Sequence, residues 1–284
     1  MSSTATSPIR FRVDPANPGQ FFACCGLLEM ADRLWSEAEG WFDGNTFFIR
    51  AMRNTATLSM LLDAAKTIQL MQIETGPNDG ENEEDEKSED AEDHISSLLI
   101  TAPVSVRLDW WSDRSLKTWA GSMNASMIFL AMCNAIDPAQ DDPLNHGTVV
   151  FDAAVQDVAS RPKRRARNPR EPFYFDARRG ANALSIDVGF STDSLKKSQE
   201  LTTVAYPVVE SMCLVGLQRC RPRPTDKPRV FDYFVWNTPI SVTVAPVAVS
   251  GLAESGSGFR FANAFRTDQK KHKAFNPATP LQRS

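Results

Sequence analysis

The chain has 284 residues, of which 42% are apolar, so it is long enough to bury a large core in one domain or in two closely packed parts. Its net charge of −4 combines two unlike parts: residues 79–93 hold ten acidic residues and one lysine, a local charge of −9, which leaves +5 for the rest. No run reaches 18 uncharged apolar residues, and the N-terminus has no apolar signal core. These features argue against a membrane-spanning helix and a secretory leader, and we expect a cytoplasmic protein.

The cysteines give no sign of a metal site or of a disulfide framework. There are five, an odd number, at positions 24, 25, 133, 213 and 220, and they form no CxxC pair. Cys24 and Cys25 stand in an apolar run, where cysteine usually acts as a small hydrophobic residue. We expect reduced thiols, no bound metal and no cofactor.

The N-terminal region predicts a strand followed by a buried helix. Residues 9–13 alternate apolar and charged side chains, the pattern of a half-buried strand. A helix is predicted over 17–35, with Asn17 as its cap and Pro18 at its first position, where the missing N–H costs nothing. Residues 21–28 are almost all apolar or glycine, so we expect this part of the helix to be enclosed on all sides.

Strands and helices follow one another without a regular βαβ order. Further strands are predicted over 46–51, 95–101, 104–111, 148–153, 184–190 and 229–236, with one or two more in 238–251. Further helices are predicted over 57–72, 115–136 and 206–220. This mixture favours an α+β fold, with mixed antiparallel sheets and packed helices, over a doubly wound parallel sheet.

Two segments are expected to lie outside the packed core. Residues 74–94 combine few apolar side chains with many like charges, and such a segment cannot offset its ordering entropy by burial, so we expect a disordered acidic insertion. The lysine- and proline-containing tail, residues 268–284, is expected to be exposed. We expect the whole chain, 1–284, to form a single α+β unit, either as one domain or as two closely packed parts.

Catalytic motifs are weak in this sequence. His94, His146 and His272 stand in an acidic run, a turn and a lysine cluster, settings typical of solvated surface histidines. There is no GxSxG elbow, and the glycine-rich stretch 255–258 has no lysine to bind a phosphate. We therefore expect a protein that is not an enzyme.

The positive signal is a basic run interleaved with aromatic residues. Arginine dominates this run, and it suits phosphate recognition because its planar guanidinium makes bidentate contacts and stacks on bases. The basic residues are Arg161, Lys163, Arg164, Arg165, Arg167, Arg170, Arg178 and Arg179. Phe173, Tyr174 and Phe175 stand beside them, as expected where bases stack next to phosphate contacts.

Two further basic clusters strengthen this signal. One is Arg219, Arg221 and Arg223 in the segment 219–229, and the other is Lys270 and Lys271, followed by Lys273. One such run alone is as often a solvated loop as a binding site, but three of them favour nucleic-acid binding. The acidic segment would then either mask these clusters or only aid solubility.

Four blocks resemble a protein family encoded in type I-U (I-G) CRISPR loci, the Csb-three family. They are NPGQFFACCGLLEMADRLW at 17–35, EPFYFDARRG at 171–180, LVGLQRCRPRP at 214–224 and FVWNTPISVTVAPVAVSG at 234–251. Together they are spread over nearly the whole chain. The chain is short for the large subunit with which this family is compared, and the acidic insertion matches no motif of the family.

The resemblance implies a non-catalytic subunit of a Cascade-like surveillance complex in bacterial antiviral defence. Such a subunit binds guide RNA and target DNA, contacts the other effector subunits, helps to recognise the flanking DNA motif and recruits the helicase-nuclease that cuts. Three alternatives stay open. One is an enzyme, either a metal-dependent nuclease or an RNA-processing endonuclease, that works through a histidine, with His146 as the candidate. The others are a backbone or RNA-capping subunit of the same complex and a scaffold that binds only protein.

Overall fold

The computed structural model describes residues 7–52, 55–73, 97–119, 124–149, 172–179, 204–253, 256–265 and 273–282. Its helices are α1 (Pro18–Trp35), α2 (Leu58–Lys66), α3 (Ala125–Asn134), α6 (Pro207–Arg219) and α7 (Ala245–Val249), with 3-10 turns at Trp110–Asp113 and Ala177–Arg179. Its strands are β1 (Ile9–Arg12), β2 (Glu39–Asp43), β3 (Thr46–Arg50), β4 (Gln69–Ile73), β5 (Ser97–Ala102), β6 (Val106–Leu108), β7 (Thr148–Val149), β8 (Val204–Ala205), β9 (Arg223–Pro224), β10 (Val230–Phe234), β11 (Ile240–Ser241), β12 (Gly258–Phe265), β13 (Lys273–Phe275) and β14 (Thr279–Pro280). The fold is α+β, as the sequence predicted.

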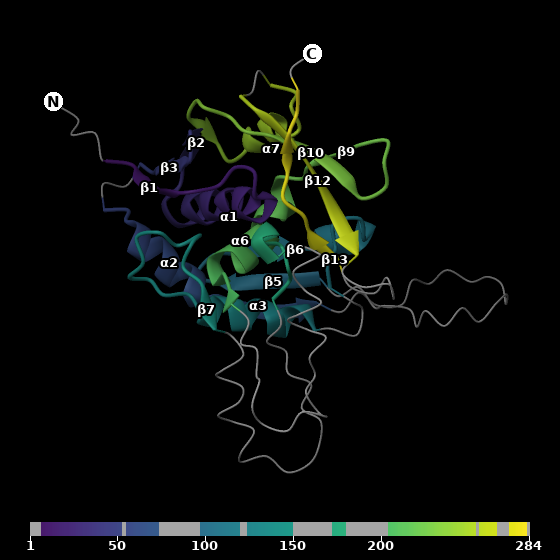
Figure 1. The fold of residues 1–284 in the computed structure, drawn as a ribbon. Coiled ribbons are helices and arrows are strands. Elements are labelled where there is room, and N and C mark those ends of the chain that lie inside the picture. Colours follow the sequence, from purple (N-terminus) through teal and green to yellow (C-terminus); the bar gives the residue numbers. More distant parts are fainter. Residues whose placement is uncertain are drawn as a thin grey trace, which may run out of the picture.

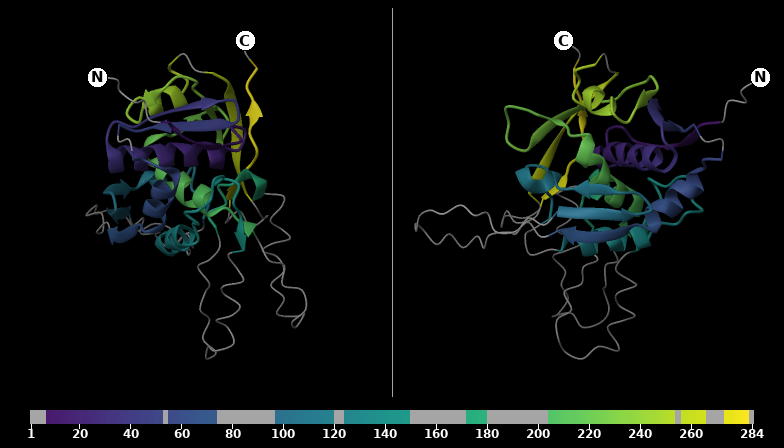
Figure 2. Two further views of the ribbon diagram at one scale, coloured as in Figure 1. Left: turned by 90° about the vertical axis from the view of Figure 1, so that its left-hand side faces the viewer. Right: turned by 180° about the vertical axis from the view of Figure 1, so that it is seen from behind.

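The described strands form four antiparallel sheets. We call β1-β3-β2-β11 the N-terminal sheet, β4-β5-β6 the middle sheet, and β13-β12-β10-β9, with β14 beside β12, the C-terminal sheet; β7 and β8 form a small pair. Helices α1 and α6 pack together at the centre (Figure 1). Helix α1 contacts β2 and β3, and α6 contacts β6, so the helix pair separates the N-terminal sheet from the middle sheet (Figure 2).

Helix α1 begins as its sequence predicts. The Asn17 side chain accepts a hydrogen bond from the backbone N–H of Gln20, and Pro18 occupies the first turn, so part of the unpaired helix end is satisfied locally. Every residue from Pro18 to Ala31 is buried, which confirms the prediction of a helix enclosed on all sides. The predicted helix at 206–220 is also confirmed, as α6, and it is buried from Pro207 to Leu217.

The two central helices touch backbone to backbone at a pair of glycines. A Cβ atom placed on Gly26 would lie 2.0 Å from the carbonyl oxygen of Met212, and one placed on Gly216 would lie 2.0 Å from that of Phe22. No side chain larger than hydrogen fits at either position without separating the helices. Glycine is therefore what permits this close packing.

An aromatic cluster joins α1 to the sheets on either side of it. The ring of Phe21 lies 5.3 Å from that of Phe42 on β2 and 4.5 Å from that of Tyr233 on β10, between ring centroids. Trp236, which follows β10, contacts both Phe21 and Phe42 edge-on. These contacts connect the N-terminal and C-terminal sheets through one core, which also contains residues as far apart as Ile9 and Ala278.

Two predicted helices are shorter in the structure. The helix predicted over 57–72 ends at Lys66, where the hydroxyl of Thr67 donates to the carbonyl of Asp63, and β4 then pairs with β5. The helix predicted over 115–136 begins only at Ala125, capped by Asn124. Trp119 is not helical but packs among other aromatic rings, because a tertiary partner outweighs the local helical pattern there.

The C-terminal part departs further from the expectations. Within 238–251 only β11 is a strand, and α7 follows it with Pro246 in its first turn. The tail is not wholly exposed, since β13 and β14 pair with β12 and Phe275 is fully buried.

Four other predicted strands are present with altered ends: 46–51 as β3, 95–101 as β5, 104–111 as β6 and 229–236 as β10. Strand β2 was not predicted. Of the strand predicted over 148–153, Thr148–Val149 is described, as β7; the acidic segment 74–94 and the strand predicted over 184–190 lie outside the described residues.

Candidate nucleic-acid interface

Two of the sequence blocks meet at the N-terminus of α1. Besides capping the helix, Asn17 accepts a hydrogen bond from the backbone N–H of Ala177 at 3.1 Å and donates through Nδ2 to Oδ1 of Asp176 at 2.9 Å. The side chain of Asp176 is fully buried. Residues separated by about 160 positions are thereby held together by hydrogen bonds, so this junction is a structural feature of the fold.

Arg178 completes this junction. Its guanidinium donates to both carboxylate oxygens of Asp176, to the backbone carbonyl of Leu144 at 2.7 Å and to Oδ1 of Asn145 at 2.9 Å. It also lies 3.3 Å from the centroid of the Tyr206 ring. Burial alone would lower the pKa of Arg178, but Asp176 outweighs it and the pKa is raised. Most of the donors of Arg178 are used inside the protein, so this residue holds segments together.

The three aromatic residues of the basic run are in the core. Phe173 and Phe175 stack on each other with centroids 5.3 Å apart, and both are fully buried, as is nearly all of Tyr174. The backbone N–H groups of Phe175 and Asp176 donate to the buried carboxylate of Glu210. Protein covers the faces of these rings, so the prediction that they stack on bases is wrong.

The second basic cluster is partly paired within the protein. Arg219 of α6 donates to Glu29 of α1 at 2.6 Å, and Arg223 lies 3.4 Å from Asp232 of the neighbouring strand. Arg221 is exposed and has no ion pair with another described residue. Of the three predicted cations, Arg221 therefore presents an uncompensated charge on the described surface.

The Glu29 ion pair predicts a dependence of stability on pH. Burial would raise the pKa of Glu29, but hydrogen bonds from Arg219 and Arg33 outweigh it and the pKa is lowered. A carboxylate whose pKa is lowered in the folded state stabilises the protein at any pH above its pKa in the unfolded chain, which is about 4.3. That stabilisation is lost as the pH falls through the folded-state pKa. We expect the difference in unfolding free energy between wild type and Glu29→Gln, measured by urea titration, to be largest near neutral pH and to shrink below about pH 4. A difference independent of pH would contradict this assignment.

The other predicted cations are not described. The residues Arg161, Lys163, Arg164, Arg165, Arg167, Arg170, Lys270 and Lys271 lie outside the described residues, as does the side chain of Arg179. Their part in binding stays a prediction.

The structure reveals a basic and aromatic surface that sequence reasoning missed, on the solvent side of the N-terminal sheet. Arg10 of β1, Phe48 of β3 and Trp41 of β2 are direct cross-strand partners in one row. The rings of Trp41 and Phe48 are stacked, with centroids 5.2 Å apart and planes 5° from parallel, and both are half-buried. Period-two alternation in 9–12, 39–43 and 46–50 places these side chains on the outer face, opposite the residues that pack on α1.

Basic side chains lie beside the stacked rings, and Glu39 and Asp43 of β2 lie on the same face. Arg12 is one position along β1 on the same face as Arg10, and both are exposed with no ion pair to another described residue. Arg50 lies 5.7 Å from the centroid of the Trp41 ring and also pairs with Glu39. We call Arg10, Arg12, Trp41, Phe48 and Arg50 the platform. It brings two aromatic rings and three arginines together on neighbouring strands.

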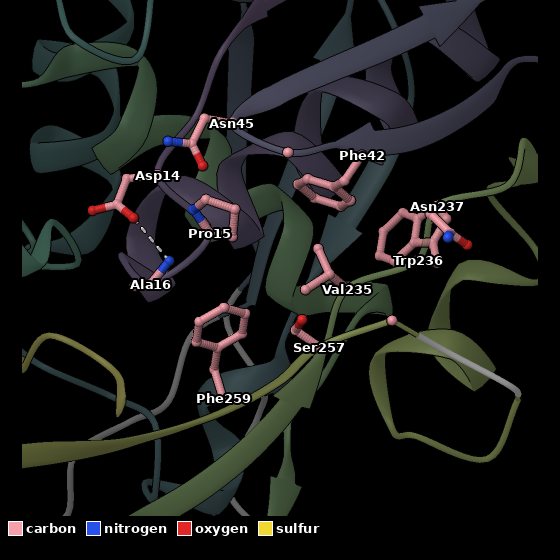
Figure 3. A pocket seen from close by; sticks show the side chains of 12 residues that line it. Asp14, Pro15, Ala16, Phe42, Asn45, Val235, Trp236, Asn237, Ser257 and Phe259 are labelled. Atoms are coloured by element: carbon pink, nitrogen blue, oxygen red, sulfur yellow. Dashed lines mark hydrogen bonds between the residues drawn. The ribbon is translucent and has the colours of Figure 1, made fainter. Parts of the chain in front are cut away.

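A pocket of about 510 Å³ lies at the end of the same sheet. Figure 3 shows Asp14, Pro15 and Phe259 along one side and Phe42, Val235 and Trp236 along the other. The remaining lining residues are Ala16, Gly44, Asn45, Asn237, Gly256 and Ser257. Aromatic and apolar groups therefore form the walls, with amide, hydroxyl and carboxylate groups among them.

His146 lies, as predicted, in the turn region between α3 and β7, where it is half-buried. Nearby, the pKa of the Asp137 carboxyl is lowered, first by a hydrogen bond from Gln140 and to a smaller extent by His146. Within the described ranges, no three His, Cys, Asp or Glu residues gather as a metal-binding group would. Each helix of that part of the chain is too short or too polar to cross a bilayer.

Comparison of the chain with protein-family models, with curated proteins and with solved structures finds no match.

Proposed function

We propose that the chain is a non-catalytic subunit of a type I CRISPR surveillance complex that binds guide RNA or target DNA through the platform. The stacked Trp41 and Phe48 rings on an open sheet face, with Arg10 and Arg12 beside them, carry this proposal. The resemblance of the sequence blocks to the Csb-three family supplies the CRISPR context. Helping to recognise the flanking DNA motif and recruiting the helicase-nuclease are part of the same proposal.

The chemistry of the platform suits a single strand. Aromatic rings on a sheet face stack on unpaired bases of any sequence, and arginines beside them contact the phosphates. Neighbouring strands lie about 4.8 Å apart, so the row Arg10, Phe48 and Trp41 spans about 10 Å across three strands. A duplex hides its base faces, so we expect single-stranded RNA or DNA to bind better than duplex.

Three exposed methionines on adjoining elements are a second feature that favours assembly with other proteins. Met60 on α2, Met71 on β4 and Met127 on α3 are each about half exposed. Helix α3 contacts both α2 and β4, so the three methionines belong to one packed group of elements. Methionine adapts to irregular partners, so these side chains are the candidates for contact with another protein.

Replacing the two rings tests the proposal. We expect the double variant Trp41→Leu/Phe48→Leu to fold and to bind a uridine-rich single-stranded RNA more weakly by about 1–3 kcal/mol for each base that loses its ring, or about 5- to 150-fold. Fluorescence anisotropy with labelled RNA measures this loss. The matched control is Met60→Leu/Met71→Leu, which alters apolar side chains away from the platform and should leave RNA affinity unchanged.

The arginines provide a second readout, because phosphate contacts make RNA affinity depend on the salt concentration. In Arg10→Gln/Arg12→Gln, the slope of log affinity against log salt should flatten by about 1.4, since each phosphate contact to a single strand contributes about 0.7. Wild-type protein that binds no RNA or DNA at low salt would favour the scaffold that binds only protein. RNA cleavage that disappears in His146→Ala would favour the endonuclease.

A further inference from the structure

The pocket in Figure 3 is bounded by four separate chain segments whose positions are set by hydrogen bonds. The backbone N–H of Phe42 donates to the carbonyl of Trp236 at 2.9 Å, and the N–H of Gly256 donates to that of Val235 at 2.8 Å. The indole N–H of Trp236 donates to the carbonyl of Gly40 at 2.8 Å. These bonds join the walls to both large sheets, so the pocket is formed without a ligand and a ligand would pay little to order it.

The lining chemistry disfavours an anionic ligand. None of the twelve lining residues is lysine or arginine, and Asp14 is the one charged residue among them. A phosphate in this pocket would face a carboxylate with no compensating cation from the lining, which is unfavourable. The side chains suit an uncharged planar group, with Phe42, Trp236 and Phe259 giving apolar contact and Asn45, Asn237 and Ser257 giving hydrogen bonds.

Asp14 is the exposed carboxylate among the lining residues, and it is a hydrogen-bond acceptor. One carboxylate oxygen accepts the backbone N–H of Ala16 at 3.0 Å, and the backbone N–H of Asp14 donates to Oε1 of Gln20 at 2.7 Å. The first bond holds one carboxylate oxygen and the second holds the backbone of Asp14. Two carboxylate oxygens together accept about four hydrogen bonds, so acceptor capacity is left for a ligand. A carboxylate is the preferred acceptor for an exocyclic amino group, as on cytosine N4.

The pocket also adjoins the platform along the chain. Arg12, Thr46 and Asp43 form the cross-strand row at the hairpin end of the outer face. Two residues beyond Arg12 is Asp14, and the hairpin residues between Asp43 and Thr46 are Gly44 and Asn45, all three of which line the pocket. Because Phe42 of the pocket and Trp41 of the platform lie on opposite faces of β2, a strand held on the platform would reach the pocket by passing around this end of the sheet.

We propose that the pocket binds one unpaired nucleobase that carries an exocyclic amino group, with Asp14 accepting from that group. This inference rests on the proposed function, because it takes the base from the strand that the platform holds. It makes the pocket the place where a sequence preference arises, since the platform rings stack on every base alike. Uracil, which lacks an amino group, is the disfavoured base.

The test uses the full chain and four labelled single-stranded RNA octamers. One is oligouridine, and the others carry a single cytidine, adenosine or guanosine at the same internal position. We expect wild type to bind at least one of the three substituted octamers about 10-fold more tightly than oligouridine, as one good base contact provides. Asp14→Asn, which keeps an oxygen for the Ala16 N–H, should lose most of this preference and bind oligouridine as wild type does.

Asn237→Ala is the second variant, because its exposed side chain lies on another wall and its loss does not endanger the fold. It should also reduce the preference and leave the affinity for oligouridine unchanged. Equal binding of all four octamers by wild type, with weaker binding in the Trp41→Leu/Phe48→Leu variant, would overturn the pocket assignment and leave the proposed function standing. Absence of RNA binding by wild type would overturn both.

The competing occupant is a lysine or arginine side chain of a protein partner, which would also suit a carboxylate. In that case an arginine-containing peptide would bind wild type and not Asp14→Asn, while wild type would show no base preference. This outcome contradicts the nucleobase assignment.

Discussion

Gly26→Ala is expected to destabilise the protein by about 4 kcal/mol or more, or to prevent folding. The new Cβ would lie 2.0 Å from the carbonyl oxygen of Met212 and 3.0 Å from the backbone nitrogen of Gly216. Both atoms belong to the backbone of a buried helix, so neither can move without shifting α6 away from α1. That shift would open the centre of the core, where burial of both helices supplies much of the stability.

A matched glycine separates this effect from the general effect of adding a methyl group. Gly44 has a positive φ of 54°, and a Cβ there would meet no atom within 4 Å. Gly44→Ala should therefore cost only the left-handed backbone strain of about 1–2 kcal/mol. Urea unfolding followed by circular dichroism compares the two variants. Equal losses in both would show that α1 and α6 do not pack as closely as the structure shows.

Arg178→Ala is expected to cost about 3–5 kcal/mol of folding free energy. The substitution leaves the carboxylate of Asp176 buried with only Asn17 and one backbone N–H as donors. It also removes the hydrogen bonds to Leu144 and Asn145 and the stacking contact with Tyr206. An unpaired buried charge accounts for most of the expected loss, because removing one partner of such a pair costs more than the pair contributes.

Two further variants make the Arg178 experiment specific. Arg178→Lys keeps the charge but cannot form the bidentate and stacked contacts together, so we expect an intermediate loss. Arg221→Ala removes an exposed arginine and should change stability by less than about 0.5 kcal/mol. If Arg178→Ala left stability unchanged and instead weakened RNA binding for one base, the sequence-based assignment of Arg178 to the nucleic-acid site would be correct.

Local chemistry was enough to predict the helical elements that carry their own signals. The cap of Asn17, the proline at position 18 and the apolar run to Leu28 predict the start and the buried first half of α1. The helix at 206–220 was predicted from its composition despite three β-branched valines. It forms because it is buried along most of its length. The pattern of 67–72 is compatible with a helix or a strand. In the structure these residues enter β4, because a strand there can pair with β5.

The candidate site was predicted less well, because charge alone does not identify a binding residue. Arg178 and Arg219 read as surface cations in the sequence, yet their partners are Asp176 and Glu29, and Glu29 is 190 positions from Arg219. The aromatic residues 173–175 stand next to the basic run in sequence but are in the core. The sequence did not predict the platform, because its five residues come from three strands and each strand contributes only one or two of them.

The sequence by itself determined the class of fold, the central buried helices and the side of β1 that faces the core, since these follow from composition, caps and periodicity within a few residues. Only the tertiary structure decided which strands are neighbours and which charges are paired. Alternation shows that Arg10, Trp41 and Phe48 point outward, but cross-strand pairing is what brings them into one row. An ion pair between distant residues likewise depends on how the helices pack, and no local pattern records that packing.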